Sequence, residues 1–347
     1  MNAHTTADEQ DQQDERDQRP GPSWEGRTVA VTGAAGFFGS RLTRRLLDAG
    51  AHVRAFVRYR SDGGIGRLSG FGEHERLEIH RGDLRDEAGL PPLLEGADAV
   101  YHLGALVSVP YSRQDPGAYL SVNTLGTCRV LTTAQRMGVG RMIVVSTSEV
   151  YGTAQTEQIT EDHPLVAQSP YSASKIAVEK VCESFHRAFG APVVTVRPFN
   201  LYGPGQSRRA VIPSLAHQIV HQDVVRVGNT SASRDFNFVQ DTVEAMQRIG
   251  LAPADRVVGQ TFNIGSDVSV SIKEVADLLS ELSGRHVVFE TDESRLRPHG
   301  VEVLRLRADS SRLRGVIGPW PRTPLEEGLR EVLDHERRSA ASVGSFI

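Results

Sequence analysis

The chain has 347 residues, of which 39% are apolar and 24% charged, with 39 basic and 43 acidic side chains. This length allows one large domain or two unequal lobes with a substantial core. The near balance of charge excludes the basic excess of proteins that bind nucleic acid or membrane surfaces. No apolar run approaches the roughly 18 residues of a membrane span. We therefore expect a cytoplasmic protein.

The start of the chain differs in composition from the rest. Residues 1–23 hold six acidic and two basic side chains, which account for the whole formal net charge of −4. They have no aliphatic run, so they cannot bury enough apolar surface to offset the entropy of ordering. We predict a disordered acidic tail over residues 1–24. It lacks the apolar core of a signal peptide.

Strand and helix patterns alternate after this tail. Apolar and β-branched runs predict strands over residues 28–32, 52–58, 77–81, 99–103, 141–146 and 192–197. Apolar positions at helical spacing predict helices over residues 40–49, 117–137 and 171–189. This alternation is typical of an α/β fold with a Rossmann-type, doubly wound parallel sheet. Beyond residue 200 only one helix is clear, over 271–282, which predicts a smaller C-terminal lobe.

The cysteines and histidines show no pattern that predicts a metal. Cys128 and Cys182 lie in helical patterns without CxxC or Cys/His spacing, so we expect core positions rather than a disulfide or zinc site. The twelve histidines are scattered along the chain. No metal site is predicted.

A glycine-rich turn lies between the first strand and the first helix. Gly33, Gly36 and Gly39 are spaced as GxxGxxG. Glycines there let backbone N–H groups approach a pyrophosphate, and the start of the helix adds partial positive charge. The turn predicts a dinucleotide site, although the spacing differs from GxGxxG.

The end of the second strand bears on the choice between NAD and NADP. An acidic residue usually stands there when the 2′-hydroxyl of NAD is bound. This strand ends at Arg58, with Arg60 close behind and the first acid at Asp62. The two arginines favour NADP over NAD. Asp83, after the third strand, is a candidate for binding the adenine or for capping its own loop.

The catalytic candidates follow the fifth strand. Tyr171 and Lys175 lie four residues apart on one helix face, and a nearby ammonium lowers the pKa of a phenol. Upstream, Thr147, Ser148 and Glu149 come directly after a buried strand, where doubly wound sheets bind ligands. These positions indicate acid–base chemistry.

Together these features resemble the nucleotide-sugar epimerase/dehydratase family of the extended short-chain dehydrogenases/reductases. The resemblance runs from about residue 27 to about residue 335. It rests on the segments Thr147-Ser-Glu-Val-Tyr-Gly152, Ser169-Pro-Tyr-Ser-Ala-Ser-Lys175, Arg197-Pro-Phe-Asn-Leu-Tyr-Gly-Pro204, Arg234-Asp-Phe, Asn263-Ile-Gly265 and Arg295-Leu-Arg-Pro298. Within the family, the segments around Glu149, Tyr171 and 209–213 are most similar to UDP-N-acetylglucosamine 4,6-dehydratases of the legionaminic acid pathway.

The resemblance implies further site residues and a domain plan. The cofactor site would add Phe37, Phe38, Leu84, Leu103 and Ala105 to the glycines, Arg58, Asp83, Tyr171 and Lys175. The substrate site would comprise Asn200, Val211, Arg234 and Arg297. The dinucleotide-binding domain would span residues 25–200 and receive about 236–266. The substrate-binding lobe would span 201–235 and 267–340.

The resemblance also implies a reaction. In a 4,6-dehydratase Tyr171 would take the proton of the C4 hydroxyl while a hydride moves to the nicotinamide, and Thr147 would hold the same oxygen. Glu149 would remove the C5 proton, water would leave from C6, and the hydride would return to C6. Ser148 stands where dTDP-glucose dehydratases have an Asp, so either Glu149 or Ser148 supplies the proton for C6.

Other activities remain open from the sequence. A UDP-glucuronate decarboxylase uses the same residues but needs a cation for its substrate carboxylate, and none can be placed. A 4-epimerase needs no base at C5, and a 5,6-dehydratase uses the same set. A non-catalytic dinucleotide sensor would commonly lack the Tyr171 and Lys175 pair.

Family members usually form homodimers through two long helices, here 117–137 and 171–189. Val178, Cys182, Phe185 and Phe189 are apolar positions that could serve this interface or the chain's own core.

Overall fold

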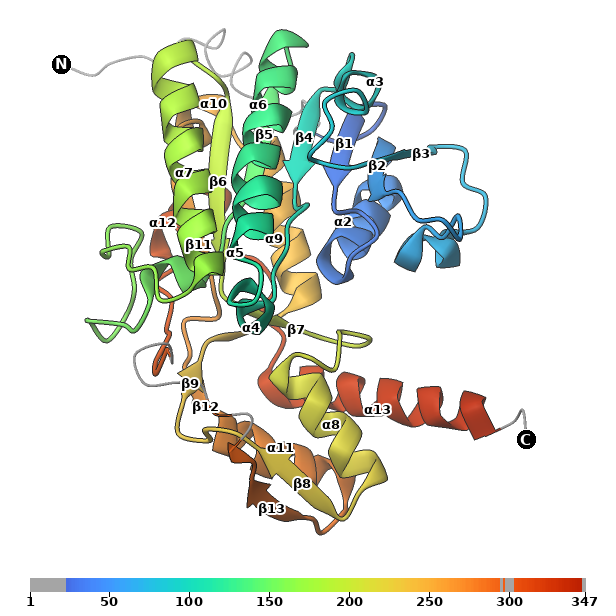
Figure 1. Ribbon diagram of the computed structural model, residues 1–347, viewed down its shortest axis with the longest axis vertical. Helices are drawn as coiled ribbons and strands as arrows, with labels where there is room; N and C mark the ends of the chain where they lie inside the picture. Colours follow the sequence, from blue (N-terminus) through green and yellow to red (C-terminus); the bar gives the residue numbers. More distant parts are fainter. Residues whose placement is uncertain (1–22, 294–295, 297–302, 345–347) are drawn as a thin grey trace, which may run out of the picture.

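The structure is a computed structural model that describes residues 23–293, 296 and 303–344 (Figure 1). The predicted tail, apart from residues 23 and 24, lies outside these ranges, as does Arg297. No helix within the described ranges combines the length and the apolar character needed to cross a bilayer.

A seven-stranded sheet with every neighbouring pair parallel forms the centre of the N-terminal part (Figure 1). Its strands, in spatial order, are β11 (Thr261–Ile264), β6 (Val193–Pro198), β5 (Arg141–Val145), β4 (Ala99–His102), β1 (Thr28–Thr32), β2 (His52–Arg58) and β3 (Leu77–Gly82). The strand order reverses between β1 and β4, which is where such sheets bind ligands. The predicted Rossmann-type fold is confirmed, with β11 as a strand that the sequence patterns did not show.

Helices cover both faces of this sheet. On one face α2 (Phe37–Asp48) and α9 (Val239–Leu251) pack with Val29 and Val31 of β1. On the other, α3 (Leu90–Leu94), α6 (Gly126–Arg136) and α7 (Pro170–Phe189) pack with Ala30 of the same strand. Successive residues of β1 thus enter opposite cores, as the two-residue period of a strand requires.

The helix expected over residues 117–137 is not continuous. It consists of α5 (Pro116–Tyr119), a π-helical turn η2 (Leu120–Leu125) and α6. Asn123 lies within the turn, and its buried side chain bonds the backbone of Leu106 on the neighbouring loop. Such π turns are frequent at functional sites. Apolar spacing alone could not show this tertiary contact.

The C-terminal part has more helices than expected. Besides α11 (Ile272–Ser283) it contains α8 (Val211–His221), α12 (Ser311–Ile317) and α13 (Leu325–Gly344). The expectation of one clear helix beyond residue 200 is therefore wrong. In α13 the many charged residues conceal an apolar stripe in which Leu329, Val332 and Leu333 are buried against α8 and α11.

The remaining elements are short. Parallel pairs join β7 (Asn200–Tyr202) to β10 (Phe236–Phe238) and β8 (Val224–Val227) to β13 (Val288–Thr291), and an antiparallel pair joins β9 (Ser233–Arg234) to β12 (Val270–Ser271). The others are η1 (Gly66–Phe71), α4 (Val109–Ser112), η3 (Ser148–Tyr151) and α10 (Ala254–Val257).

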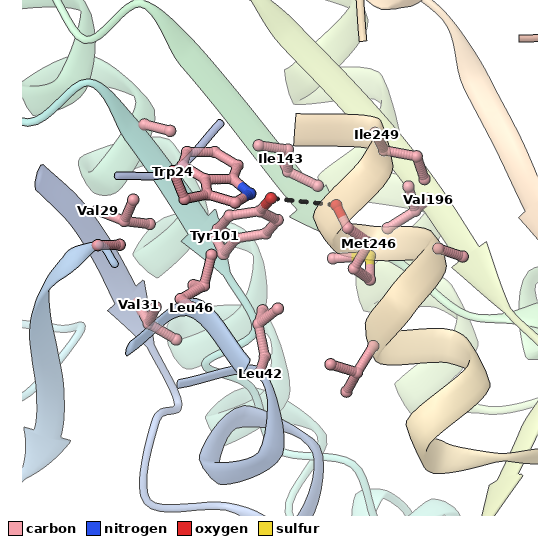
Figure 2. Packing of buried hydrophobic residues seen from close by; sticks show 14 of the residues in the cluster. Trp24, Val29, Val31, Leu42, Leu46, Tyr101, Ile143, Val196, Met246 and Ile249 are labelled. Atoms are coloured by element: carbon pink, nitrogen blue, oxygen red, sulfur yellow. Dashed lines mark hydrogen bonds between the residues drawn. The ribbon is translucent and has the colours of Figure 1, made fainter. Parts of the chain in front are cut away.

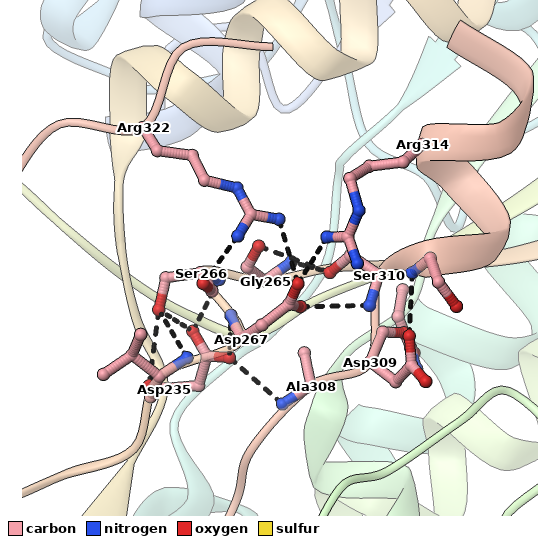
Figure 3. Close-up of polar contacts among 12 residues, drawn as sticks. Asp235, Gly265, Ser266, Asp267, Ala308, Asp309, Ser310, Arg314 and Arg322 are labelled. Atoms are coloured by element: carbon pink, nitrogen blue, oxygen red, sulfur yellow. Dashed lines mark hydrogen bonds and ion pairs between the residues drawn. The ribbon is translucent and has the colours of Figure 1, made fainter. Parts of the chain in front are cut away.

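A buried carboxylate connects the segments that run between the two parts (Figure 3). Asp235 is fully buried and accepts hydrogen bonds from the backbone N–H groups of Ser266, Asp267 and Ala308 at 2.8–3.0 Å. Burial raises the pKa of this carboxyl group, while these donors oppose the rise. Asp267 in turn pairs with Arg314 and Arg322.

Trp24 belongs to the core rather than to the tail (Figure 2). Its side chain is 1% exposed, its ring lies 5.9 Å from that of Tyr101, and Tyr101 donates a hydrogen bond to the carbonyl of Met246 on α9. The predicted tail boundary at residue 24 is therefore wrong by at least this residue. An isolated Trp beside a polar run gives no periodic signal for burial.

We predict that Trp24→Ala lowers the free energy of unfolding by about 3–5 kcal/mol, because it leaves a cavity between β4 and α9. Urea unfolding of the variant measures this. Tyr59, whose side chain is 68% exposed, provides the control. Tyr59→Ala should change stability by less than about 0.5 kcal/mol. Equal effects of the two substitutions would contradict the placement of Trp24.

Candidate active site

The predicted site residues gather at the carboxyl edge of the sheet. Gly33 follows β1, Leu103 and Ala105 follow β4, Thr147 follows β5 and Asn200 follows β6. Because the strands are parallel, their carboxyl ends meet at one edge. The topology therefore brings together residues from 33 to 200.

The glycine-rich turn has the geometry of a phosphate cradle. Gly33 has φ of 71°, and a Cβ there would lie 2.8 Å from the nitrogen of Gly104. A Cβ on Gly39 would lie 2.1 Å from the oxygen of Gly33, so this glycine is required for helix–strand packing. Gly36 is exposed and precedes α2 without a side-chain cap, and the first turn of α2 holds no acid. The first N–H groups of α2 can thus bind an anion.

The other cofactor candidates surround this turn. Phe37 is half-buried beneath the guanidinium of Arg41, whose carbon lies 4.3 Å from the ring centre, and Phe38 packs against the core. Leu84 is 8% exposed and faces Gly104. Leu103 and Ala105 are half-buried. These side chains are apolar, as the surroundings of the adenine and nicotinamide rings of a dinucleotide usually are.

The charged candidates near the second strand are placed differently. Arg58 is exposed, whereas Arg60 pairs with Asp62 through two hydrogen bonds of 2.7 and 3.1 Å. Asp83 accepts two hydrogen bonds from the Arg85 guanidinium and one from the Arg85 backbone, which hold the pKa of Asp83 down at about 2. In this structure Asp83 caps its loop, the second of its two predicted roles. The charge of Arg58 also lowers the pKa of Asp83.

Tyr171 and Lys175 lie in the first two turns of α7. The helix begins at a capping box in which the Ser169 hydroxyl accepts from the Ser172 amide. Tyr171 is 6% exposed, with its ring 6.1 Å from that of Tyr119 at an interplanar angle of 78°. Lys175 is 5% exposed and donates to the carbonyl of Val145, the last residue of β5, at 2.7 Å.

The electrostatics of this pair differ from the expectation. Burial raises the pKa of the Tyr171 phenol, a hydrogen bond with Thr147 lowers it, and the charge of Glu149 raises it. Burial also lowers the pKa of Lys175 to about 8. In the protein alone, burial therefore raises the pKa of the phenol, which is opposite to the direction expected from the Tyr171–Lys175 spacing.

The segment after β5 presents its side chains in different ways. Thr147 caps η3, with its hydroxyl accepting from the Glu149 amide at 3.2 Å. Ser148 is 3% exposed, whereas Glu149 is half-buried. Thr147 and Glu149 both act on the Tyr171 phenol, so these three residues share one site.

A buried ion pair that the sequence analysis missed supports the end of β5. Glu179 on α7 accepts from the Arg197 guanidinium at 2.9 and 2.6 Å and from the Ser146 hydroxyl at 2.5 Å. Arg197 also donates to Tyr151 of η3 at 2.7 Å. The pair therefore joins α7, β5, β6 and η3. Arg197 is the first residue of one of the segments that carry the family resemblance, but nothing in the sequence indicated that it pairs with Glu179.

A second missed contact fixes the other side of α7. Asn123 in the π turn donates to the Ser174 hydroxyl at 3.0 Å and bonds both backbone groups of Leu106. His102 bonds Thr32 and Thr127, and burial lowers its pKa to about 3, so it is neutral. A buried Asn within a helical pattern was the available signal for this contact.

Three of the four residues predicted to bind substrate lie in the part of the chain that the structure describes. Asn200 is half-buried, and its Oδ1 atom has no hydrogen-bond partner in the part of the chain that the structure describes. Val211 is the first residue of α8. Arg234 is 7% exposed and donates to the Ser233 carbonyl. Asn200 is thus an amide with one hydrogen-bonding atom available for a ligand.

Comparisons with known proteins agree with this architecture. The family model described as GDP-mannose 4,6 dehydratase matches residues 30–332. A dTDP-glucose 4,6-dehydratase of Streptomyces griseus is 34% identical over 322 residues, covering 90% of this chain and 95% of that protein. The chain belongs to the nucleotide-sugar epimerase/dehydratase family.

Relatives of this family differ in the reactions for which they are named. A UDP-glucose 4-epimerase of Mycolicibacterium smegmatis is 31% identical over 318 residues, covering 89% of this chain and 98% of that protein. The crystal structure of UDP-glucuronic acid 4-epimerase from Bacillus cereus, in complex with UDP-glucuronic acid and NAD, has a TM-score of 0.83 and 27% identity. It covers 90% of this chain and 99% of that one. The predicted family is confirmed, and a nicotinamide dinucleotide fits the glycine-rich turn. NADP in preference to NAD stays a prediction.

We predict that Glu179→Gln lowers the free energy of unfolding by about 3–5 kcal/mol, because it leaves the Arg197 guanidinium buried without a countercharge. Urea unfolding measures the loss. Glu183→Gln on the same helix is the matched control, since Glu183 pairs with Lys180 at the surface and should cost less than about 1 kcal/mol. A small effect of Glu179→Gln would show that the pair does not support the site.

Proposed function

We propose that this protein is a nucleotide-sugar 4,6-dehydratase that acts on a UDP-hexose such as UDP-N-acetylglucosamine. The observation that carries the proposal is the position of Glu149, two residues after Thr147 and close enough to affect the pKa of Tyr171. Elimination across C5 and C6 needs a base in addition to the group that acts at C4, whereas 4-epimerisation does not. The similarity of the segments around Glu149 and Tyr171 to UDP-N-acetylglucosamine 4,6-dehydratases supports the choice of sugar.

The residues around the β1–α2 turn would hold NAD or NADP. Gly33, Gly36 and the first N–H groups of α2 would bind the pyrophosphate, and Lys175 would hold the nicotinamide ribose. The bound nicotinamide would supply the hydride chemistry, with a hydride taken from C4 of the sugar and returned to C6. Arg58 remains the candidate contact to a 2′-phosphate.

Side chains of the protein carry out the proton transfer at the C4 hydroxyl. Tyr171 takes the proton of the C4 hydroxyl at its Oη atom, and Thr147 holds the same sugar oxygen. Since burial disfavours the phenolate, Tyr171 needs a cation beside it, and Lys175 is the only cation in the first two turns of α7.

Glu149 serves the elimination. Its carboxylate removes the C5 proton, which the neighbouring C4 ketone acidifies, and passes that proton to the C6 hydroxyl, which leaves as water. Ser148 is 3% exposed, whereas Glu149 is half-buried, so Glu149 is better placed to deliver the proton. A proton returns to C5 as C6 is reduced, so the overall change is the loss of one water.

The substrate contacts belong to the same proposal. Asn200 and Arg234 would bind the diphosphate, for which the planar guanidinium is suited. Val211 would contact the nucleotide, and Arg297, which lies outside the described residues, would add a second cation.

The first test is the product. Purified protein with UDP-N-acetylglucosamine should give a sugar nucleotide lighter by one water, as measured by mass spectrometry. Panels of UDP-, GDP- and dTDP-sugars test the nucleotide. An unchanged mass with inverted C4 would indicate an epimerase, and loss of carbon dioxide from UDP-glucuronate would indicate a decarboxylase. Absence of turnover with every sugar would favour a dinucleotide sensor.

The second test is the base. We expect Glu149→Gln to slow water loss by at least about 100-fold, because an acid–base group typically contributes that much. Binding of the dinucleotide should be unchanged. Glu157→Gln is the control, since the Glu157 side chain is 79% exposed and pairs with Arg307. Normal turnover of Glu149→Gln would overturn the assignment.

We also propose a homodimer formed through the α6–α7 face. Val178 and Cys182 lie in the chain's own core, so they cannot serve this interface. Phe189 at the end of α7 is 60% exposed and Leu125 at the end of η2, directly before α6, is 53% exposed, which leaves apolar side chains on this face for a second copy. Light scattering should give twice the monomer mass, and Phe189→Asp with Leu125→Asp should give the monomer.

A further inference from the structure

Two histidines on α8 and a glutamate on α13 form a cluster in the C-terminal part. His217 and His221 lie four residues apart, so their side chains project from one face of α8. Their ring centres are 4.6 Å apart. Glu336 projects from α13, and its Oε2 atom is 3.3 Å from Nδ1 of His217. No step of the proposed dehydration uses these residues.

The distances suit a metal ion. Zinc bound to nitrogen and oxygen ligands has bonds of about 2.0–2.1 Å in a tetrahedral arrangement, so its ligand atoms are about 3.4 Å apart. The His217–Glu336 separation already has this value. One ligand atom from each of the three residues lies within 4.8 Å of the others. A small rotation of the exposed His221 ring would complete the set.

The surroundings favour an ion over a simple ion pair. Glu336 is 6% exposed, and a buried carboxylate requires a cation or several donors. Arg208 donates to it at 3.0 Å from a side chain that is 53% exposed, so this countercharge lies at the surface. The His221 ring has no hydrogen-bond partner among the residues that the structure describes. It is therefore a ligand without a competing contact.

The two helices hold the cluster in place. The two helices are in contact (Figure 1), and Ala216 and Ile219 of α8 belong to the same buried apolar cluster as Leu329, Val332 and Leu333 of α13. Because this apolar contact sets the spacing of the helices, the three ligands are brought together without the ion. Imidazole and carboxylate ligands suit zinc and other late transition metals, whereas magnesium prefers oxygen alone.

We propose that His217, His221 and Glu336 bind a divalent transition-metal ion such as zinc, with water in the fourth position, and that the ion links α8 to α13. The expectation of no metal site is thereby revised, since the two histidines do have the HxxxH spacing. The carboxylate that completes the set is 119 residues away along the chain.

Tag-free protein stripped with EDTA tests this site. Calorimetric titration with Zn²⁺ should show one bound ion, and the melting temperature should rise with Zn²⁺ because the ion binds only the folded form. Mg²⁺ at the same concentration should change neither. Absence of zinc binding, or equal stabilisation by Mg²⁺, would overturn the proposal.

Variants then locate the ion. His221→Gln removes an exposed ligand and should leave the fold intact, while zinc affinity falls by at least about tenfold. Glu336→Gln should have the same effect on zinc. His286→Gln, an exposed histidine of the same part of the chain, is the matched control and should bind zinc like the unchanged protein. Equal affinity of His221→Gln and His286→Gln would show that the ion binds elsewhere.

Discussion

The buried ion pair of Glu179 and Arg197 is the interaction on which the geometry of the proposed catalytic site depends. Charges excluded from water need close and complete pairing, and the two hydrogen bonds of 2.6 and 2.9 Å provide it. Glu179 also receives the hydroxyl of Ser146, the residue before Thr147. The pair therefore aligns α7, which carries Tyr171, with η3, which carries Glu149 and follows the end of β5. If the ion pair broke, Tyr171 and Glu149 would no longer be held in fixed positions relative to each other.

A comparable constraint holds the C-terminal part in position. Asp235 is buried next to Arg234, and its oxygens bond backbone groups of two segments, at Ser266–Asp267 and at Ala308. The position of Arg234, which is proposed to bind the diphosphate, thus depends on the neighbouring Asp235 carboxylate, which has no proposed contact with the substrate. In both cases a buried acidic side chain, Glu179 or Asp235, fixes the position of residues in the proposed site.

The sequence predicted the sheet and much of the site because these follow local rules. The spacing of Gly33 and Gly39 reflects contacts within one turn, and alternating apolar runs place six strands within one residue of their observed ends. Local patterns failed where a distant group intervened. The contact of Asn123 with Leu106, 17 residues away along the chain, interrupts the helix that apolar spacing had predicted as continuous.

The sequence by itself determined the residue types, their order and the parallel topology, since periodicity and turn chemistry act over a few residues. Only the tertiary structure decided which charged side chains form ion pairs and which side chains are buried away from water. It joined Glu336 to His217 and excluded water from Tyr171, which reversed the expected direction of its pKa shift. Pairing and hydration depend on distances through space and on burial by other segments, and spacing along the chain specifies neither.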